Sequence, residues 1–345
     1  MKTIAAILIE NNKPLVIKKI EIPPLKEGQV LIKMLYAGIC HSQLNEIKGL
    51  KGEDKYLPHL LGHEGSGIVQ EIGFGVNKIK KGDYVVVSWI KGKGKNVTST
   101  KYFQNKEKYN SGSITTFNQY SVISENCLFK IPKEIPPDVA ALLGCAIPTG
   151  AGIVKNELNI KEGDTLAIFG IGGIGTSALI YANALNCSKI IAIDINENKL
   201  LQAKEYGAIE IINPTKENVI SKIKELTNGE GVDHAIECSG VKKVMETAFQ
   251  SIKDGGTVVI AGNLKKGETI SIDPFELIKG KKIIGTWGGG TNSDEDIPYY
   301  VQSYQNGKLP IEKLISKKYK LKDINKAFID LEQGKVIRAL INCQE

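Results

Sequence analysis

The chain has 345 residues, more than one ordinary hydrophobic core accommodates, so about two domains are expected. Apolar residues make up 42% and charged residues 24%, as in soluble globular proteins, and no apolar run approaches the roughly 18–20 residues of a membrane span. The net charge of +7 is spread over lysines interleaved with acidic residues, and the lysine run at 91–95 is short and rich in glycine. We therefore expect no nucleic-acid partner and no membrane partner.

The first 148 residues predict an irregular β-rich domain. The N-terminal apolar run ends at Glu10 and lacks a cleavage site, which indicates a first strand in a cytoplasmic protein rather than a signal peptide. Further short apolar runs are separated by turns such as 74–77 and 81–83, which contain Gly, Asn, Lys or Asp.

The pattern changes after this point. From Thr165 onward, apolar runs alternate with helix-like stretches, which predicts βαβ units and a buried parallel sheet in a domain spanning 149–286. The alternation stops near Trp287, and the tail predicts helices around 296–305 and 324–333 and a last strand. Because about sixty residues are marginal for a core of their own, we expect 287–345 to return to the 1–148 domain.

A glycine-rich turn lies between a buried-strand pattern and a helix-like stretch. Gly170, Gly172 and Gly175 have the GxGxxG spacing. The first glycine allows the tight turn, the second lets the backbone approach a pyrophosphate, and the third lets the helix pack on the strand. With Gly173 and Ile174, which complete the turn, they predict a dinucleotide site at a helix N-terminus.

Asp194 closes the strand that follows this turn in the sequence. A carboxylate at that place accepts hydrogen bonds from the adenosine ribose and repels a 2′-phosphate, which favours NAD over NADP. The alternative is that Asp194 caps the next helix. Lys199 is a candidate for the same ribose and is also a plausible surface lysine.

Cysteine and histidine residues predict a metal site rather than disulfides. None of the six cysteines forms a CxxC pair, and the chain shows no secretory signal. Taken singly, Cys40, His63 and Cys145 are unremarkable. Together they supply the donor set of a catalytic zinc, which takes three protein ligands and leaves one position open. The spacing alone does not establish this set, because the three residues are far apart in sequence.

A series of motifs follows along the chain in the order AGICHSQ, LGHEGSGIV, KGDYV, GCAIPTGAG, GIGGIG, the strand ending at Asp194, ECSG and GKVIRALI. Through these motifs the sequence resembles, over nearly its whole length, the zinc-containing alcohol dehydrogenases of the medium-chain dehydrogenase/reductase superfamily. The resemblance implies an α/β protein with a GroES-like β-rich catalytic domain (1–148 and 287–345) and an inserted Rossmann domain with a doubly wound parallel sheet (149–286).

The resemblance also implies roles for single residues. The matching positions are Cys40, His63 and Cys145 as ligands of a catalytic zinc, Glu64 as an acidic group near the metal, Ser42 as the hydroxyl that carries the alcohol proton away, His41 near the cofactor pyrophosphate, Thr149 on the nicotinamide side, and Arg338 as a pyrophosphate-binding arginine.

The sequence departs from the family at three places. Residues 88–112 contain no cysteine where the family usually carries four, so we expect one zinc per chain and no structural zinc. Gln43 replaces the usual aspartate that orients the metal-bound histidine; an amide can accept the same hydrogen bond with less electrostatic support. Asn45 replaces the outer histidine of the proton relay, so the proton must pass from Ser42 to the cofactor ribose, to His41 or to water.

The function that follows is hydride transfer between a small-molecule alcohol and NAD, giving an aldehyde or ketone. The rivals are a zinc-free quinone or enoyl reductase on the same fold, which would lack the Cys/His set, and a noncatalytic NAD-binding protein. Gln43, Asn45 and the glycine-rich stretch around Trp287 hint at a polyol, an amino alcohol or a sugar derivative, while a simple primary alcohol stays open. A homodimer or homotetramer is expected from the resemblance alone.

Overall fold

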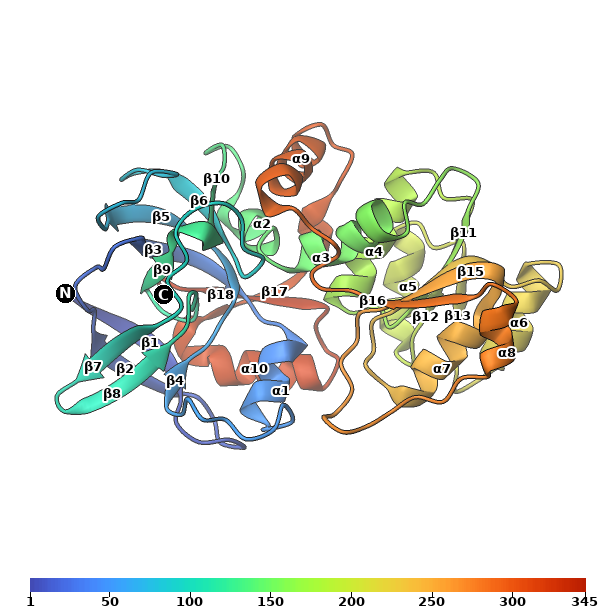
Figure 1. Cartoon of the computed structure of the whole chain (residues 1–345), viewed down its shortest axis with the longest axis horizontal. Helices are drawn as coiled ribbons and strands as arrows, with labels where there is room; N and C mark the ends of the chain where they lie inside the picture. Colours follow the sequence, from blue (N-terminus) through green and yellow to red (C-terminus); the bar gives the residue numbers. More distant parts are fainter. The chain divides into compact units, whose positions relative to one another are not determined.

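The computed structural model describes all 345 residues, which form two compact units (Figure 1). The first unit comprises Met1–Cys145, Asn292–Gly307 and Ile311–Glu345, and the second comprises Ala146–Thr291 and Lys308–Pro310. No helix in the structure combines the length and apolar character needed to cross a membrane.

The first unit is built mainly of antiparallel strands. Strands β1, β2, β7, β8 and β4 form a closed barrel, and a seven-stranded sheet runs in the order β10-β6-β5-β3-β18-β17, with β9 also paired to β3. The tail joins this sheet because β18 pairs with β3, with Leu340 opposite Gly38. The elements of the first unit are β1 (Lys2–Leu8), β2 (Val16–Glu21), β3 (Gln29–Gly38), α1 (His41–Ile47), β4 (His59–Leu60), β5 (Glu64–Ile72), β6 (Tyr84–Ser88), β7 (Thr100–Gln104), β8 (Glu107–Ser111), β9 (Tyr120–Ser124), η1 (Glu125–Cys127), β10 (Leu128–Lys130), α2 (Pro137–Leu142), α9 (Ser293–Gln305), η3 (Ile311–Leu314), β17 (Ile315–Lys320), η4 (Leu321–Asp323), α10 (Ile324–Glu332) and β18 (Arg338–Asn342).

Two apolar cores flank β3, because successive side chains of a strand point to opposite faces. Val30, Ile32 and Met34 belong to one core, whereas Leu31 belongs to the other, together with Ile7 of the barrel. All five side chains are buried. The strand is therefore held from both sides, and its C-terminal end, two residues before Cys40, is fixed in place.

The second unit is a six-stranded parallel sheet with helices packed on it. The strand order is β13-β12-β11-β14-β15-β16, which is the 3-2-1-4-5-6 order of a Rossmann fold. Its elements are α3 (Ala146–Gly152), η2 (Ile153–Glu157), β11 (Thr165–Phe169), α4 (Gly173–Ala184), β12 (Lys189–Ile193), α5 (Glu197–Glu205), β13 (Glu210–Ile212), α6 (Val219–Leu226), β14 (Val232–Glu237), α7 (Lys242–Ser251), β15 (Ile252–Ile260), α8 (Pro274–Ile278) and β16 (Lys282–Gly285).

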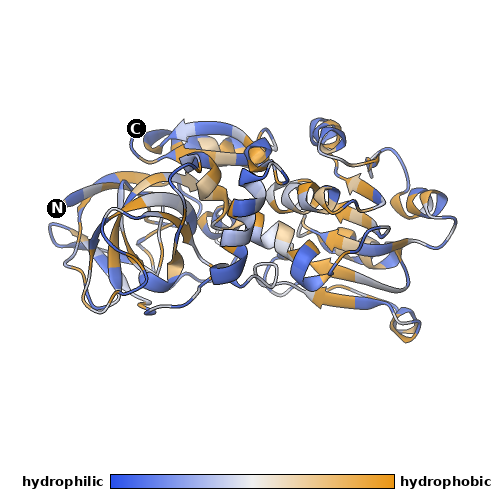
Figure 2. Ribbon diagram, turned by 90° about the horizontal axis from the view of Figure 1, so that it is seen from above, coloured by the Kyte–Doolittle hydropathy of each residue, from blue (hydrophilic) through white to orange (hydrophobic).

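Alternating side chains of β11 bury both faces of this sheet. Ala167 and Phe169 pack with Ile223 of α6 and Phe249 of α7, and Ile168 faces the start of α4. Hydrophobic colouring accordingly follows the strands of this sheet (Figure 2). Strands β12 and β13 lie on one side of β11, whereas β14, β15 and β16 lie on the other, so the strand order switches between β11 and β14. Such sheets bind ligands at the carboxyl ends of the strands beside this switch point.

The element boundaries expected for the tail hold to within a few residues. The helix expected at 296–305 begins earlier, at Ser293, because Asp294 and Glu295 extend its acidic first turn, which suits a helix N-terminus. The helix expected at 324–333 ends at Glu332.

Candidate metal centre and dinucleotide site

The three predicted metal ligands meet in the first unit. Cys40 precedes α1, His63 precedes β5 and Cys145 follows α2, and their ligand atoms all lie within 4.8 Å of one another. Two sulfurs and one imidazole nitrogen at this separation fit a zinc ion with a fourth position left open. The fold therefore assembles a donor set that the sequence spacing could not establish.

Close backbone packing holds Cys145 in this cluster. A Cβ atom on Gly144 would lie 2.3 Å from the Val87 carbonyl oxygen, so only glycine fits there. The Ser88 hydroxyl donates a hydrogen bond of 2.7 Å to the Gly144 carbonyl. The end of β6 thus fixes the residue before Cys145.

Cys40 differs electrostatically from the cysteines outside the cluster. A hydrogen bond from Cys145 holds the pKa of the Cys40 thiol well below its usual range against the opposing effect of burial, and His63 and the charge of Arg338 act in the same direction. Burial instead raises the pKa of Cys127 to about 12 and that of Cys187 to about 11. Since the thiolate is the form that binds a metal, Cys40 lies in the environment a ligand needs.

Gln43 contacts His63 differently from our expectation. We expected its amide oxygen to accept a hydrogen bond from the imidazole, but that oxygen accepts the Cys40 N–H at 2.9 Å. The amide nitrogen lies 2.7 Å from His63 Nδ1 instead. The reason is local: Gln43 is the N3 residue of α1, and a glutamine there returns to the N-cap N–H as in a capping box. Only if the amide turned over and released Cys40 would its oxygen face the imidazole.

Glu64 and Arg338 form a buried ion pair next to the metal cluster. Their side chains are 0% and 4% exposed, and the Arg338 guanidinium donates to Glu64 Oε1. Glu64 is pressed against Gly38, where any Cβ would overlap the carboxylate. Arg338 belongs to the first unit and the glycine turn to the second, so its contact with a pyrophosphate stays a prediction.

The other predicted catalytic residues lie on α1. His41 is exposed at the start of the helix, and Ser42 is half-buried beside it. Ser42 Oγ accepts a hydrogen bond of 3.0 Å from Lys51, a residue that sequence reasoning missed because a lysine in a glycine-containing loop carries no signal. Trp89, also missed, packs edge-on to the His63 ring with 6.3 Å between centroids.

The glycine turn has the geometry that dinucleotide binding requires. Gly170 has a φ of +92°, a conformation that side chains disfavour. A Cβ on Gly175 would lie 2.1 Å from the Gly170 carbonyl oxygen, whereas one on Gly172 would meet nothing within 4 Å. Gly175 therefore serves helix packing, and the open space over Gly172 is the cradle that a pyrophosphate would fill.

This difference gives a sharp prediction for two glycines. Gly172→Ala is expected to fold normally but bind NAD about 10-fold more weakly or worse, because the added methyl group occupies the pyrophosphate position. Gly175→Ala is expected to lower the melting temperature, because its methyl group overlaps backbone. Fluorescence titration with NADH and thermal melts measure both, with Gly112→Ala as the control, since a Cβ there also meets nothing within 4 Å. A Gly172→Ala protein with unchanged affinity would contradict the assignment.

Asp194 braces the glycine turn directly. Its Oδ2 accepts the Ile171 N–H at 2.7 Å, and its Oδ1 accepts the Asn196 N–H at 2.9 Å. The alternative that Asp194 caps α5 is wrong, because the cap is Asn196, whose side chain accepts the N–H groups of Asn198 and Lys199. Asp194 keeps free lone pairs at the end of β12, where a ribose would lie.

Two further predicted cofactor residues lie in the same unit. Thr149 is buried in α3, and its hydroxyl has no hydrogen-bond partner, which leaves a polar atom for a bound group to satisfy. The next residue, Gly150, packs against the Ile174 carbonyl oxygen at the start of α4. Lys199 is half-buried in the first turn of α5.

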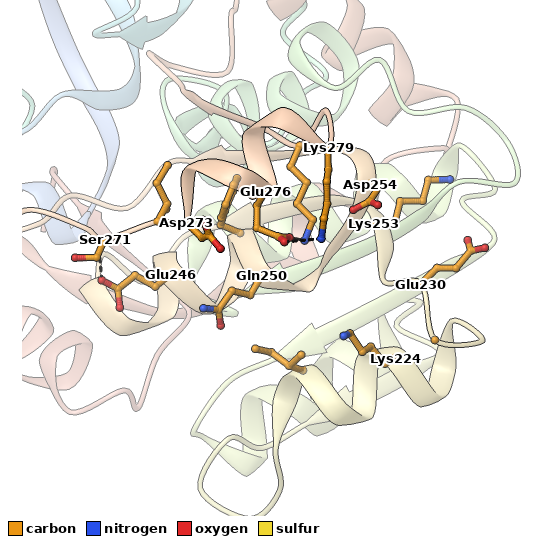
Figure 3. Close-up of a pocket in the computed structure, with 15 residues that line it drawn as sticks. Lys224, Glu230, Glu246, Gln250, Lys253, Asp254, Ser271, Asp273, Glu276 and Lys279 are labelled. Atoms are coloured by element: carbon orange, nitrogen blue, oxygen red, sulfur yellow. Dashed lines mark hydrogen bonds and ion pairs between the residues drawn. The ribbon is translucent and has the colours of Figure 1, made fainter.

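A separate cavity of about 830 Å³ opens in the second unit, lined from α6, α7, α8 and the loops around them (Figure 3). None of the predicted site residues lines it. Hydrogen bonds from Lys279 and Lys281 lower the pKa of Glu276 to about 2. Within the cavity, Glu276 therefore pairs with Lys279 and Lys281 at 2.8 and 2.6 Å.

Carboxylates hold the loop that follows β6. Glu125 Oε1 accepts the N–H groups of Asn77 and Lys78 at 2.6 and 2.8 Å, and its Oε2 accepts the Lys95 N–H at 2.8 Å. Asp294 Oδ2 accepts the Lys93 N–H at 2.6 Å. Residues 88–112 contain no cysteine, and these acceptors tie the loop at 93–95 to η1 and α9.

Comparison with known proteins agrees with this geometry. Residues 26–133 match the family of the alcohol dehydrogenase GroES-like domain, and residues 173–306 match the zinc-binding dehydrogenase family. The chain is 35% identical to alcohol dehydrogenase class-3 of Dictyostelium discoideum, over 98% of this chain and 97% of that protein. It is also 35% identical to S-(hydroxymethyl)glutathione dehydrogenase of Synechocystis sp., over 99% of this chain and 100% of that protein.

Solved structures extend the similarity to the whole fold. Benzyl alcohol dehydrogenase from Acinetobacter calcoaceticus superposes with a TM-score of 0.90 at 29% identity, and 2R,3R-butanediol dehydrogenase from Bacillus subtilis with 0.80 at 29% identity. Each comparison covers 99% of both chains. The chain therefore belongs to the zinc-containing alcohol dehydrogenases of the medium-chain dehydrogenase/reductase superfamily, with a GroES-like domain and a Rossmann domain.

Proposed function

We propose that this protein is a zinc-dependent dehydrogenase that interconverts an alcohol and its aldehyde or ketone with NAD(H). The observation that carries the proposal is the cluster of Cys40, His63 and Cys145, with ligand atoms within 4.8 Å of one another. The zinc-free reductases of this fold would have no use for that donor set, and neither would a noncatalytic NAD-binding protein. In the corresponding domain division, 1–148 with 287–345 is catalytic and 149–286 binds NAD.

Different residues hold the metal, orient the dinucleotide and transfer the substrate proton. When bound, zinc supplies a Lewis acid for the substrate oxygen and NAD accepts the hydride. Cys40, His63 and Cys145 hold the metal, and Ser42 on the first turn of α1 transfers the proton of the substrate hydroxyl. The glycine turn and Asp194 orient the dinucleotide, and Thr149 offers its unpaired hydroxyl to it.

The preference for NAD rests on Asp194. Replacement by serine is expected to reduce kcat/KM with NAD and raise it with NADP, so that their ratio falls about 10-fold or more, because the carboxylate that repels a 2′-phosphate is removed. Initial rates with both cofactors measure this ratio. Because Asp194 also accepts the Ile171 N–H, Asp194→Asn is the matched control that keeps an acceptor without the charge. A wild-type enzyme that prefers NADP would overturn the proposal.

We further propose one zinc per chain. The absence of cysteines from 88–112 and the tethering of that loop by Glu125 and Asp294 support it. Elemental analysis of purified protein gives the stoichiometry directly. Two zinc ions per chain would refute the proposal. Protein that contains no zinc would also refute it and would favour the alternative function, a zinc-free quinone or enoyl reductase.

The substrate is proposed at the level of its class, a small primary or secondary alcohol, a polyol or a sugar derivative. The relatives' names extend the panel to benzyl alcohol, 2,3-butanediol and S-(hydroxymethyl)glutathione. NADH formation across this panel, with zinc measured on the same preparation, tests the function. Zinc-loaded protein that reduces no NAD with any of these alcohols would refute it.

We also propose a homodimer or homotetramer. Strand β16 is an open edge of the parallel sheet, and apolar side chains around it are exposed, with Ile278 at 78% and Trp287 at 82%. Natural proteins usually cover such an edge. Light scattering that gives a monomer would contradict this proposal. The cytoplasmic location stays a prediction.

A further inference from the structure

A lysine lies directly behind the proposed proton-transfer serine. Lys51 Nζ donates hydrogen bonds to Ser42 Oγ at 3.0 Å and to Glu46 Oε2 at 2.9 Å. Ser42 and Glu46 are four residues apart on α1, so they share one face of the helix. The loop after α1 folds back because Gly49 N–H donates to the Glu46 carbonyl and Leu50 N–H to that of Asn45, at 3.0 and 2.9 Å.

Further polar side chains lie beside Glu46. Its Oε1 lies 3.7 Å from His59 Nε2, and the same nitrogen lies 2.7 Å from Asp54 Oδ2. His59 is buried, and its Nδ1 lies 3.0 Å from the Leu60 carbonyl oxygen. Glu46, Asp54 and His59 are close enough to resemble a metal site. However, Lys51 and the imidazole of His59 already contact the two carboxylates, so the cluster is a network of side-chain contacts within the protein.

This network places a proton-carrying side chain beside Ser42, which Asn45 cannot provide. A carboxamide neither gains nor loses a proton near neutral pH, whereas the lysine side chain carries N–H protons that it can donate. Lys51 is 48% exposed, so it can exchange protons with water, and its other hydrogen bond reaches Ser42. We propose that Lys51 is the proton-exchange group behind Ser42, in the role that Asn45 cannot take. The proposal rests on the dehydrogenase function proposed above.

The proton transfers balance in both directions. During carbonyl reduction, the substrate oxygen takes a proton from Ser42 Oγ, Ser42 takes one from Lys51 Nζ, and the neutral amine takes one from water and leaves hydroxide. During alcohol oxidation each transfer runs in reverse. The two electrons travel with the hydride of the nicotinamide and do not involve Lys51. Glu46 keeps the lysine aligned with Ser42 and is a positioning residue.

Three substitutions at Lys51 separate proton exchange from charge and packing. Lys51→Ala and Lys51→Met remove the amine, and both are expected to lower kcat about 10- to 100-fold with little change in KM. Lys51→Arg keeps a cation that can donate to Ser42 but does not release its proton. It is expected to be as slow as Lys51→Met. Added methylamine is expected to restore part of the kcat of Lys51→Ala and to leave Lys51→Arg unchanged.

Lys48→Ala is the matched control, because Lys48 lies in the same segment and pairs with Glu332 rather than Ser42. It is expected to keep wild-type kcat and to gain nothing from methylamine. Zinc content and melting temperature, measured for every variant, are expected to stay unchanged. Wild-type kcat in Lys51→Ala or in Lys51→Arg would overturn the proposal. A rise confined to KM would also overturn it and would make Lys51 a binding group for an anionic substrate.

A measurement without turnover tests the contact itself. Mass spectrometry after brief acetylation gives the reactivity of Lys51 relative to Lys48, and this ratio is expected to rise at least twofold in Ser42→Ala and Glu46→Gln. An unchanged ratio would refute the network even in an inactive preparation. Wild-type protein that lacks all dehydrogenase activity would refute the proposed function, whereas active wild type with a fully active Lys51→Ala would refute only the role of Lys51.

Discussion

Replacing Cys40 by serine is expected to cost the protein its zinc and more than about 100-fold in turnover. Loss of an outer-shell partner of a metal ligand already costs about 10–100-fold, and loss of a ligand removes more. The neighbouring Cys145, together with His63 and Arg338, holds the pKa of Cys40 well below its usual range, so the wild-type site offers a thiolate. A serine hydroxyl gives up its proton far less readily and binds zinc weakly. Elemental analysis and NAD reduction measure the two losses.

Cys187→Ser is the matched control for this experiment. Cys187 is also buried, but burial raises its pKa to about 11, and its sulfur contacts the Asp164 carbonyl oxygen at 2.9 Å. A serine hydroxyl can keep that hydrogen bond, so zinc and turnover are expected to stay at wild-type levels. Bound zinc and full turnover in Cys40→Ser would remove Cys40 from the ligand set.

Most of the fold was readable from the sequence because its signals are local. The alternation of apolar strands and helices after Thr165 predicted the parallel sheet, and the glycine spacing located the turn after β11. The metal site is different, since its ligands lie at the ends of β3, β4 and α2 and meet only through strand pairing and the packing of Gly144 against β6. Family resemblance, and not the spacing, brought them together in the prediction.

The details that the sequence did not reveal depend on competition between neighbouring groups. The Gln43 amide oxygen could accept from the His63 imidazole or from the Cys40 N–H, and it accepts from Cys40 at the N-terminus of α1. Asp194 had a helix start beside it, but Asn196 is better placed to cap that helix. Lys51 reaches Ser42 only because its loop folds back over α1. In each case residue type allowed the contact, and only the backbone geometry decided it.

Replacing Arg338 by methionine is expected to have the largest effect on stability, a loss of about 3–5 kcal/mol in the free energy of unfolding. Glu64 is 0% exposed and the Arg338 side chain 4%, so removal of the guanidinium leaves a carboxylate that water cannot reach. The carboxylate also lies close against Gly38, where a Cβ would be 2.3 Å from Glu64 Oε1. Denaturant unfolding with a matched surface control, Lys222→Met, measures the effect. Lys222 pairs with Glu225 at 2.8 Å on the surface of α6, and its loss is expected to leave the free energy of unfolding nearly unchanged.

The double variant Glu64→Gln with Arg338→Met separates the two roles of the arginine. It removes both buried charges, so most of the lost stability is expected to return, as for other buried pairs replaced by uncharged groups. If Arg338 also binds the cofactor pyrophosphate, the refolded double variant still lacks that guanidinium, and its affinity for NADH is expected to stay at least about 10-fold below wild type. Wild-type affinity in a stable double variant would show that Arg338 neutralises Glu64 and does not bind the dinucleotide. The nearby charge of Arg338 also lowers the pKa of Cys40, so reduced zinc content in Arg338→Met would tie the buried pair to the metal site rather than to the cofactor.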